Sequence, residues 1–120
     1  MTPIPKRTRL IRGLLACGWT KTDWPKTSKY ACYFSPITSQ VALVGPAGAM
    51  RILANDQTPI SQSTSATDSL QYRALIEIGH PSQSFANPEE ARAGLALAMD
   101  RIRTEARKQR DAKAKAKVKS

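Results

Sequence analysis

Chemistry in this chain could start from its one histidine, its two cysteines and a run of serines between residues 60 and 66. His80 has no carboxylate or nucleophile at a spacing that would pair with it, so we expect it at a helix end, contacting terminal carbonyls. Cys17 and Cys32 form no CxxC pattern, and the serines lack a general base. The sequence therefore predicts no catalytic, metal or cofactor site.

A glycine-rich segment at residues 45–51 shares its glycines with phosphate-binding loops. It lacks the GK[ST] ending of such a loop and joins two expected strands, so we predict a tight turn. Arg51 follows this turn and is the first cation after Lys29, which makes it a candidate phosphate ligand.

Charge is the strongest signal in the sequence. The 120 residues carry a net charge of +10, and the positive charge lies at the two ends. Residues 1–30 hold seven Lys and Arg against Asp23 alone, and residues 101–120 hold nine against two acids. The middle of the chain is net acidic. Two basic blocks on a small protein indicate a polyanionic partner, of which nucleic acid is the commonest.

We expect the cations of the first helix and of the C-terminal tail to contact phosphates, and Trp24 to stack on a base. Alternatively, the cations of the first helix form a solvated helix face, and Trp24 covers the edge of the core. The candidate nucleic-acid-binding residues are Lys6, Arg9, Arg12, Lys21, Trp24, Lys26, Lys29, Arg51, Arg107, Lys108, Arg110, Lys113 and Lys115.

The helices and strands that position these residues can be predicted from the sequence pattern. Together they indicate an α+β fold: a three-stranded antiparallel meander packed by helices, with a long C-terminal helix and a basic tail. One domain covers residues 1–110, and the tail covers 111–120. The expected helices are 5–17, 69–78 and 88–109, and the expected strands are 28–35, 40–45 and 49–54.

Local patterns add detail to these elements. Alternation along the first strand predicts that Tyr30, Cys32 and Phe34 face the core. Thr67 or Asp68 is expected to cap the second helix, and Asn87 with its capping-box partner is expected to open the third. The Lys–Ala tail has no apolar face, so we expect either a frayed helical extension or a disordered segment.

Partners and compartment follow from the same composition. No segment approaches the roughly 20 apolar residues of a membrane span, and the basic N-terminus is too interrupted for a signal peptide. We expect a cytoplasmic protein with reduced thiols. The small residues Ala91, Gly94 and Ala98 would permit close helix approach, so we expect the third helix to pack either on the same core or on a second copy, giving a homodimer.

Two segments within residues 7–54, Leu10–Trp19 and Thr27–Pro36, follow a known pattern of a helix ending in Gly-Trp and a strand ending in Pro. In these segments the chain resembles the HicA toxin family. The resemblance implies a small fold like that of the double-stranded-RNA-binding domain, α-β-β-β-α, in a family that cleaves mRNA. Ser28 matches the serine of the family's Gly-Ser-His motif, and Lys29 stands where its catalytic histidine would be. The resemblance thus implies that the first helix and the strand bearing Lys29 share a surface facing RNA or DNA.

Three functions follow in order of preference. The first is a non-enzymatic nucleic-acid-binding protein that contacts phosphates through the first helix and the tail. The second is a small inhibitor or adaptor of the phage anti-defence, anti-CRISPR kind, which binds an acidic protein surface or a nucleoprotein complex. The third is a degenerate HicA-like ribonuclease that uses Lys29, Tyr30 or His80.

Overall fold

The structure, a computed structural model, describes residues 4–23 and 29–118, and for 113–118 it describes the backbone alone. Two candidate site residues, Trp24 and Lys26, lie outside the described residues, as does the expected first residue of the strand 28–35.

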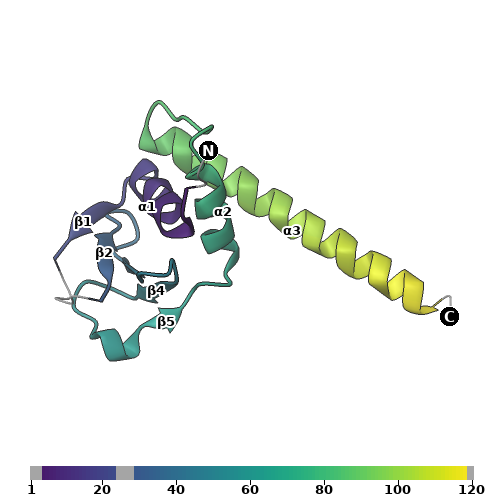
Figure 1. Ribbon diagram of the computed structural model, residues 1–120, viewed down its shortest axis with the longest axis horizontal. Coiled ribbons are helices and arrows are strands. Elements are labelled where there is room, and N and C mark those ends of the chain that lie inside the picture. The colour runs from purple at the N-terminus through teal and green to yellow at the C-terminus, as the bar shows by residue number, and fades with distance from the viewer. Residues whose placement is uncertain (1–3, 24–28, 119–120) are drawn as a thin grey trace.

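The chain forms an antiparallel sheet and three α-helices, which confirms the α+β class (Figure 1). The strand order is β1-β2-β3-β4-β5, so each strand pairs with its neighbour in sequence. The elements, in chain order, are α1 Lys6–Ala16, β1 Thr20–Thr22, β2 Ala31–Phe34, β3 Val41–Val44, β4 Met50–Leu53, the 3-10 helix η1 Ile60–Gln62, β5 Thr64–Ser65, α2 Leu70–Ile78 and α3 Pro88–Val118.

The three strands expected from sequence form the middle of the sheet, and a short strand extends the meander at each edge. β1 and β5 lie between the helices and strands expected from the sequence, in segments where none was predicted. Their residues are polar and few, so they carry no alternation of apolar side chains. They are strands only because β2 and β4 offer them backbone partners.

The predicted tight turn joins β3 to β4. The Gly48 amide donates to the Gly45 carbonyl at 3.0 Å, and Gly48 has a φ of 92°, a conformation that glycine adopts without strain. The Tyr72 hydroxyl of α2 donates to the Gly48 carbonyl at 2.7 Å. The turn is therefore tied to the second helix.

α1 and α2 pack side by side on one face of the sheet, and the main core lies between them and the strands (Figure 1). Leu10 and Leu14 stand four residues apart on α1 and are fully buried against Leu75 of α2 and Val44 and Met50 of the sheet. Trp19 also belongs to this core.

The other face of the sheet carries a second, smaller cluster, which corrects the predicted orientation of β2. Tyr33, together with Ala31, packs toward the helices, whereas Cys32, Tyr30 and Phe34 belong to the opposite cluster. That cluster includes Val41, Leu43 and Leu53 and is joined by Ile60 of η1. Alternation alone could not tell the two faces apart, because both bury apolar side chains.

The cap of α2 is Ser69, not Thr67 or Asp68 as predicted. The Ser69 hydroxyl oxygen accepts a hydrogen bond from the Tyr72 amide at 3.1 Å. The Thr67 hydroxyl is engaged elsewhere, because it bonds to both the amide and the carbonyl of Met50 in β4. Thr67 thus fixes the loop that leads into α2.

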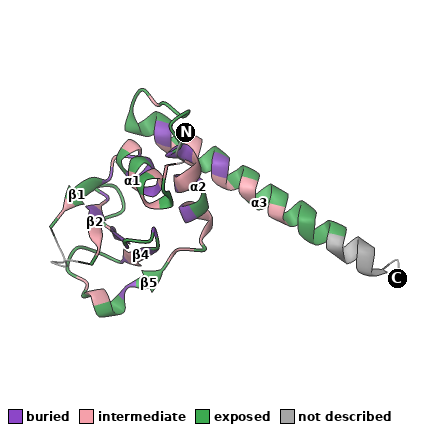
Figure 2. Cartoon of the chain, in the orientation of Figure 1, coloured by how far each residue is buried: buried purple, intermediate pink, exposed green. Residues whose placement is uncertain are grey.

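The start of α3 agrees with its sequence signals. Asn87 Oδ1 accepts from the Glu90 amide at 2.8 Å, and the Glu90 carboxylate accepts from the Ala86 amide. Its end does not: α3 continues to Val118, nine residues past the predicted end at 109, and includes most of the expected tail. The first half packs on α2 and α1, and the second half leaves the domain (Figures 1 and 2).

The small-residue stripe of α3 is covered by the protein itself. Ala91 and Ala98 lie in the main core, and Gly94 lies under the ring of Phe85. A homodimer through α3 would have to use other residues. Among the residues that the structure describes, no helix combines the length and apolar character needed to cross a membrane.

Candidate nucleic-acid interface

The cationic row of α1 lies along the junction with α2. Lys6 and Arg12 are exposed, and Arg9 is half-buried. Arg9 Nε donates to the Ile76 carbonyl at 3.1 Å, and Arg12 Nε donates to the Gly79 carbonyl at 3.2 Å. Two of the three predicted phosphate ligands therefore also join the two helices.

These bonds have a clear electrostatic cause. The last carbonyls of a helix have no intrahelical partner and form its negative end, and α2 has no basic residue in its own last turn. Arg9 and Arg12 supply the missing donors from α1. A guanidinium carries five N–H groups, so each arginine donates one to the carbonyl of α2 and has others that can donate to an anion.

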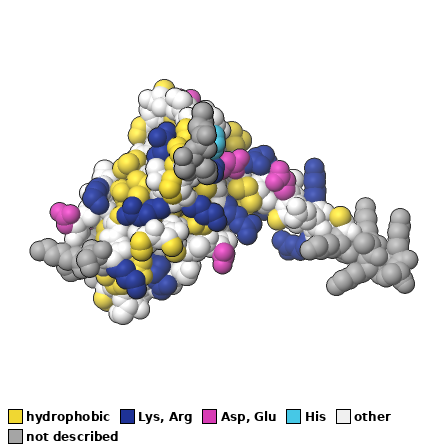
Figure 3. Space-filling model, in the orientation of Figure 1, with side chains coloured by type: hydrophobic (Ala, Val, Ile, Leu, Met, Phe, Trp, Pro, Cys, Tyr) yellow, Lys and Arg dark blue, Asp and Glu magenta, His cyan; other side chains and the backbone are white. Residues whose placement is uncertain are grey.

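Arg73 of α2 completes a basic groove that the sequence did not indicate. It is exposed and lines one shallow hollow together with Lys6, beside Tyr72, Ile76 and the single acid Asp68. We define the α1–α2 basic groove as Lys6, Arg9, Arg12 and Arg73. Figure 3 shows Lys and Arg side chains gathered over these helices and continuing along α3. Arg73 stands in the net-acidic middle of the chain, so only the packing of α2 on α1 reveals it.

Arg51 is engaged on the far side of the sheet. It pairs with Leu43 across the strands, which places it on the face of the second cluster. Arg51 Nε donates to the Ser63 hydroxyl at 2.6 Å, and Nη2 donates to the Ser63 carbonyl at 2.8 Å. This arginine joins β4 to the segment before β5, away from the α1–α2 basic groove.

Lys21 and Lys29 are exposed but stand apart from the groove. Lys21 lies on the edge strand β1, with its Nζ 5.4 Å from the centroid of the Tyr33 ring, a cation–π distance. Lys29 precedes β2 and borders the residues that are not described. The structure thus brings Lys6, Arg9 and Arg12 together and leaves Lys21, Lys29 and Arg51 elsewhere.

The projecting half of α3 carries the third group of cations. Arg107, Lys108 and Arg110 are exposed, and within the described part of the chain none of them forms an ion pair. Arg103 lies 3.6 Å from Asp100, and Arg101 pairs with Glu77 of α2 and Glu105 of its own helix. Arg101 therefore helps to fix α3 on α2. For Lys113 and Lys115 the structure gives only the helical backbone.

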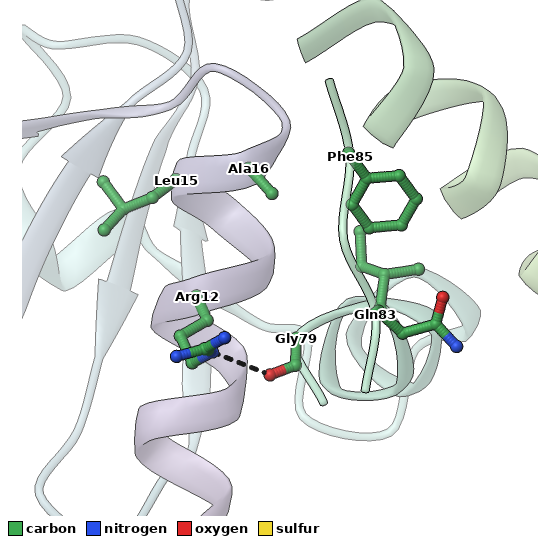
Figure 4. Close-up of a pocket in the computed structure, with 7 residues that line it drawn as sticks. Arg12, Leu15, Ala16, Gly79, Gln83 and Phe85 are labelled. Atoms are coloured by element: carbon green, nitrogen blue, oxygen red, sulfur yellow. Dashed lines mark hydrogen bonds between the residues drawn. The ribbon is translucent and has the colours of Figure 1, made fainter. Parts of the chain in front are cut away.

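A shallow pocket of about 360 Å³ opens at the other end of the α1–α2 basic groove (Figure 4). Its lining residues are Arg12, Leu15, Ala16, Ile78, Gly79, Gln83 and Phe85. The Arg12 guanidinium reaches across from α1 to the Gly79 carbonyl, and Gln83 and Phe85 stand on the opposite wall. The pocket is apolar with one cation at its rim, and Leu15 beside it is 49% exposed.

Groups with catalytic potential are engaged structurally. The backbone amide of His80 donates to the Glu77 carbonyl at the end of α2, at 3.2 Å, whereas its ring Nδ1 lies 2.7 Å from the Ser82 hydroxyl and not against a helix carbonyl as predicted. Cys17 and Cys32 are buried and are not joined in a disulfide. Burial raises the pKa of the Cys17 thiol to about 11, against the opposing effect of Arg92, so the nucleophilic thiolate is disfavoured. Among the described residues, no cluster of His, Cys, Asp and Glu could hold a metal ion.

Arg92 repeats the arrangement seen at α2. Its Nη1 donates to the carbonyl of Cys17, the residue that ends α1, at 3.2 Å. Each of the first two helices is therefore capped at its C-terminal end by arginine from another helix. No local pattern in the sequence indicates these contacts, because the donor and the acceptor are 67 or 75 residues apart.

Comparison with protein-family models, with curated proteins and with solved structures gave no match to this chain. The resemblance of residues 7–54 to the HicA family therefore stays a prediction.

Proposed function

We propose that this protein is a non-enzymatic nucleic-acid-binding protein that contacts phosphates through the α1–α2 basic groove and through the cations of α3. The groove is the observation that supports this best. Its members come from two helices, and Arg9 and Arg12 are already held by backbone carbonyls. A side chain that is ordered before binding loses less conformational entropy when it meets a phosphate.

Salt dependence would be the signature of such an interface. Each neutralised phosphate releases condensed counterions, so affinity falls as salt rises. If roughly five to seven cations reach phosphates, the slope of log K against log salt is about −5 to −6. These contacts supply affinity and orientation but little choice of sequence.

The test is a fluorescence-anisotropy titration of DNA and RNA, duplex and single-stranded, across a salt series. The Lys6→Ala/Arg73→Ala double variant removes two exposed groove charges. The Lys21→Ala/Lys29→Ala variant removes the same charge from two exposed positions elsewhere on the surface. We expect the groove variant to weaken binding about tenfold or more and to reduce the slope by about two, and the control to bind within about threefold of wild type. Equal losses, or no binding of any nucleic acid near physiological salt, would contradict the proposal.

The pocket in Figure 4 favours a second candidate, a small inhibitor or adaptor that binds a protein. A half-exposed leucine beside an apolar pocket with an arginine at the rim suits an acidic protein segment that presents one apolar side chain. Leu15→Gln, which removes the apolar side chain without adding charge, separates the two candidates. It should abolish binding of such a protein partner and leave nucleic-acid affinity within about threefold, since Leu15 is outside the groove.

We propose that this activity belongs to the cytoplasm. The two cysteines are not joined in a disulfide, and reduced cysteines are usual in that compartment.

A further inference from the structure

In the part of α3 whose side chains the structure describes, packing on the domain ends near Ile102. The last side chains that pack on the core are Met99 and Ile102, and every residue from Arg107 to Ala112 is exposed. Helix continues to Val118, so about 18 Å of single helix extends beyond Ala106 at 1.5 Å per residue. Figures 1 and 2 show this rod leaving the domain, and it accounts for the 55 Å length of a molecule otherwise 35 by 32 Å.

An isolated helix with no apolar face is marginal in water, because little besides its own backbone bonds stabilises it. Contacts with a partner on several sides would stabilise such a helix. An α-helix with its side chains is about 10–12 Å across, and the major groove of B-form DNA is about 12 Å wide. The major groove of duplex RNA is deep and narrow, and side chains do not read it.

The exposed arginines of the rod share one face. Arg103, Arg107 and Arg110 stand at positions i, i+4 and i+7 of α3, a spacing that aligns side chains along one side of a helix. They span about 10 Å, close to three base pairs at 3.4 Å each. Arginine is the side chain that most often donates two hydrogen bonds to O6 and N7 of guanine. The neighbouring acids, Asp100 and Asp111, lie toward one flank of this face, and Asp100 is the acid that contacts Arg103.

The α1–α2 basic groove lies on the two helices that contact the first half of α3. Arg101 of α3 pairs with Glu77 of α2 near the point where α3 leaves the domain. Phosphate contacts by the groove would fix how the rod enters the duplex, while contacts along the rod would reach base edges. We propose that α3 inserts into the major groove of duplex DNA, with Arg103, Arg107 and Arg110 facing the base pairs. This inference rests on the proposed nucleic-acid binding and adds the class of partner and the mode of binding.

The experiment compares three random-sequence pools across a salt series: duplex DNA, duplex RNA, and duplex DNA in which every guanine is 7-deazaguanine. The last pool lacks the N7 acceptor in the major groove and keeps every phosphate. Two proteins are used, the full chain and the Arg103→Lys/Arg107→Lys/Arg110→Lys variant, which keeps its charge. Lys21→Arg, a charge-conserving change on the edge strand β1 and outside the basic groove, is the control.

For the full chain we expect DNA to bind at least about tenfold more tightly than RNA, and 7-deazaguanine to weaken DNA binding several-fold. The triple variant should lose the effect of 7-deazaguanine and keep the salt slope, while Lys21→Arg keeps both. Equal affinity for RNA and DNA, or no response to 7-deazaguanine, would overturn the insertion and leave the phosphate interface standing. No binding to any pool would overturn the proposed function as well.

Discussion

Gly13 of α1 lies directly against the backbone of Leu75 in α2. A Cβ atom at Gly13 would stand 2.3 Å from the Leu75 carbonyl oxygen, well inside van der Waals contact. A second glycine, Gly79, has the same relationship in reverse with the carbonyl of Arg9. The two helices approach this closely only because both side chains are absent, and the approach lets Arg9 and Arg12 reach the end of α2.

Gly13→Ala should therefore destabilise the protein despite the higher helix propensity of alanine. The obstacle is a backbone carbonyl, which cannot rotate away, so the helices must separate and the core between them must loosen. We expect the free energy of unfolding to fall by about 3 kcal/mol or more. Urea denaturation followed by tryptophan fluorescence measures this, since Trp19 is part of that core.

Gly94→Ala is the matched control. A Cβ there would lie 2.8 Å from Cε1 of Phe85, the far end of a side chain that can rotate. The gain in helix propensity of about 1 kcal/mol offsets that adjustment, so the unfolding free energy should stay within about 1 kcal/mol of wild type. A cost as large as that of Gly13→Ala would mean that the helix crossing is not what position 13 protects.

The double role of Arg12 can be separated by paired substitutions. Arg12→Lys and Arg12→Met both remove the Nε donor to the Gly79 carbonyl, so each should lower the unfolding free energy by about 0.5–1.5 kcal/mol. Only Arg12→Met removes the charge. Nucleic-acid affinity, measured by anisotropy at low salt, should fall about three- to tenfold in Arg12→Met and change little in Arg12→Lys. Similar affinities in the two variants would exclude Arg12 from the interface.

Stability should fall between pH 9 and 11 because of Cys17. Its thiol has an ordinary pKa of 9.0, and burial raises the pKa to about 11 in the folded protein. Above pH 9 the unfolded thiol ionises while the folded one stays neutral, so ionisation favours unfolding; below pH 9 this effect is absent. The full difference corresponds to on the order of 2–3 kcal/mol.

Cys17→Ala tests this directly, because lysine and tyrosine titrations affect both proteins alike. The stability advantage of wild type over Cys17→Ala should shrink as pH rises from 9 to 11, as measured by urea denaturation at each pH. An advantage that stays constant over this range would show that the thiol does not resist ionisation in the folded state.

The ion pair between Glu77 and Arg101 should matter more for binding than for folding. Both side chains are more than 40% exposed, and surface pairs of this kind contribute about 0–1 kcal/mol. Glu77→Gln should barely change the unfolding free energy. It should tighten nucleic-acid binding two- to fivefold at low salt, because it removes a negative charge next to the groove and releases Arg101, and the gain should vanish at high salt. A gain that persists at high salt would point to a different cause.

Local patterns in the sequence were enough to predict the strongly signalled elements. Asn87, Pro88 and Glu90 marked the start of α3 correctly because caps and first-turn residues act within four positions. The end of α3 was wrong because the Lys–Ala segment has no stop signal and no apolar face to define it. The edge strand β5, only two residues long, depends on its pairing with β4 rather than on its own residues.

The candidate site was only partly predictable. Lys6, Arg9 and Arg12 could be grouped from their spacing of three along one helix. Their division into exposed charges and helix-capping donors could not, because it depends on carbonyls of α2 that lie 67 residues away. Arg73 and Arg51 could not be assigned from the sequence either. Arg73 lines the groove and Arg51 bonds to Ser63, and no neighbouring residue in the sequence distinguishes the two arginines.

The brevity of the two outer strands has a consequence for how the protein behaves at high concentration. β1 has three residues and β5 has two, so neither border of the sheet presents a long row of unpaired amides and carbonyls. Long exposed edge strands allow sheets from separate molecules to pair into fibrils, whereas short edge strands offer too few backbone groups for such pairing. Lys21 on β1 adds charge repulsion between copies at one of these borders. The fold thus protects an otherwise apolar sheet from aggregation.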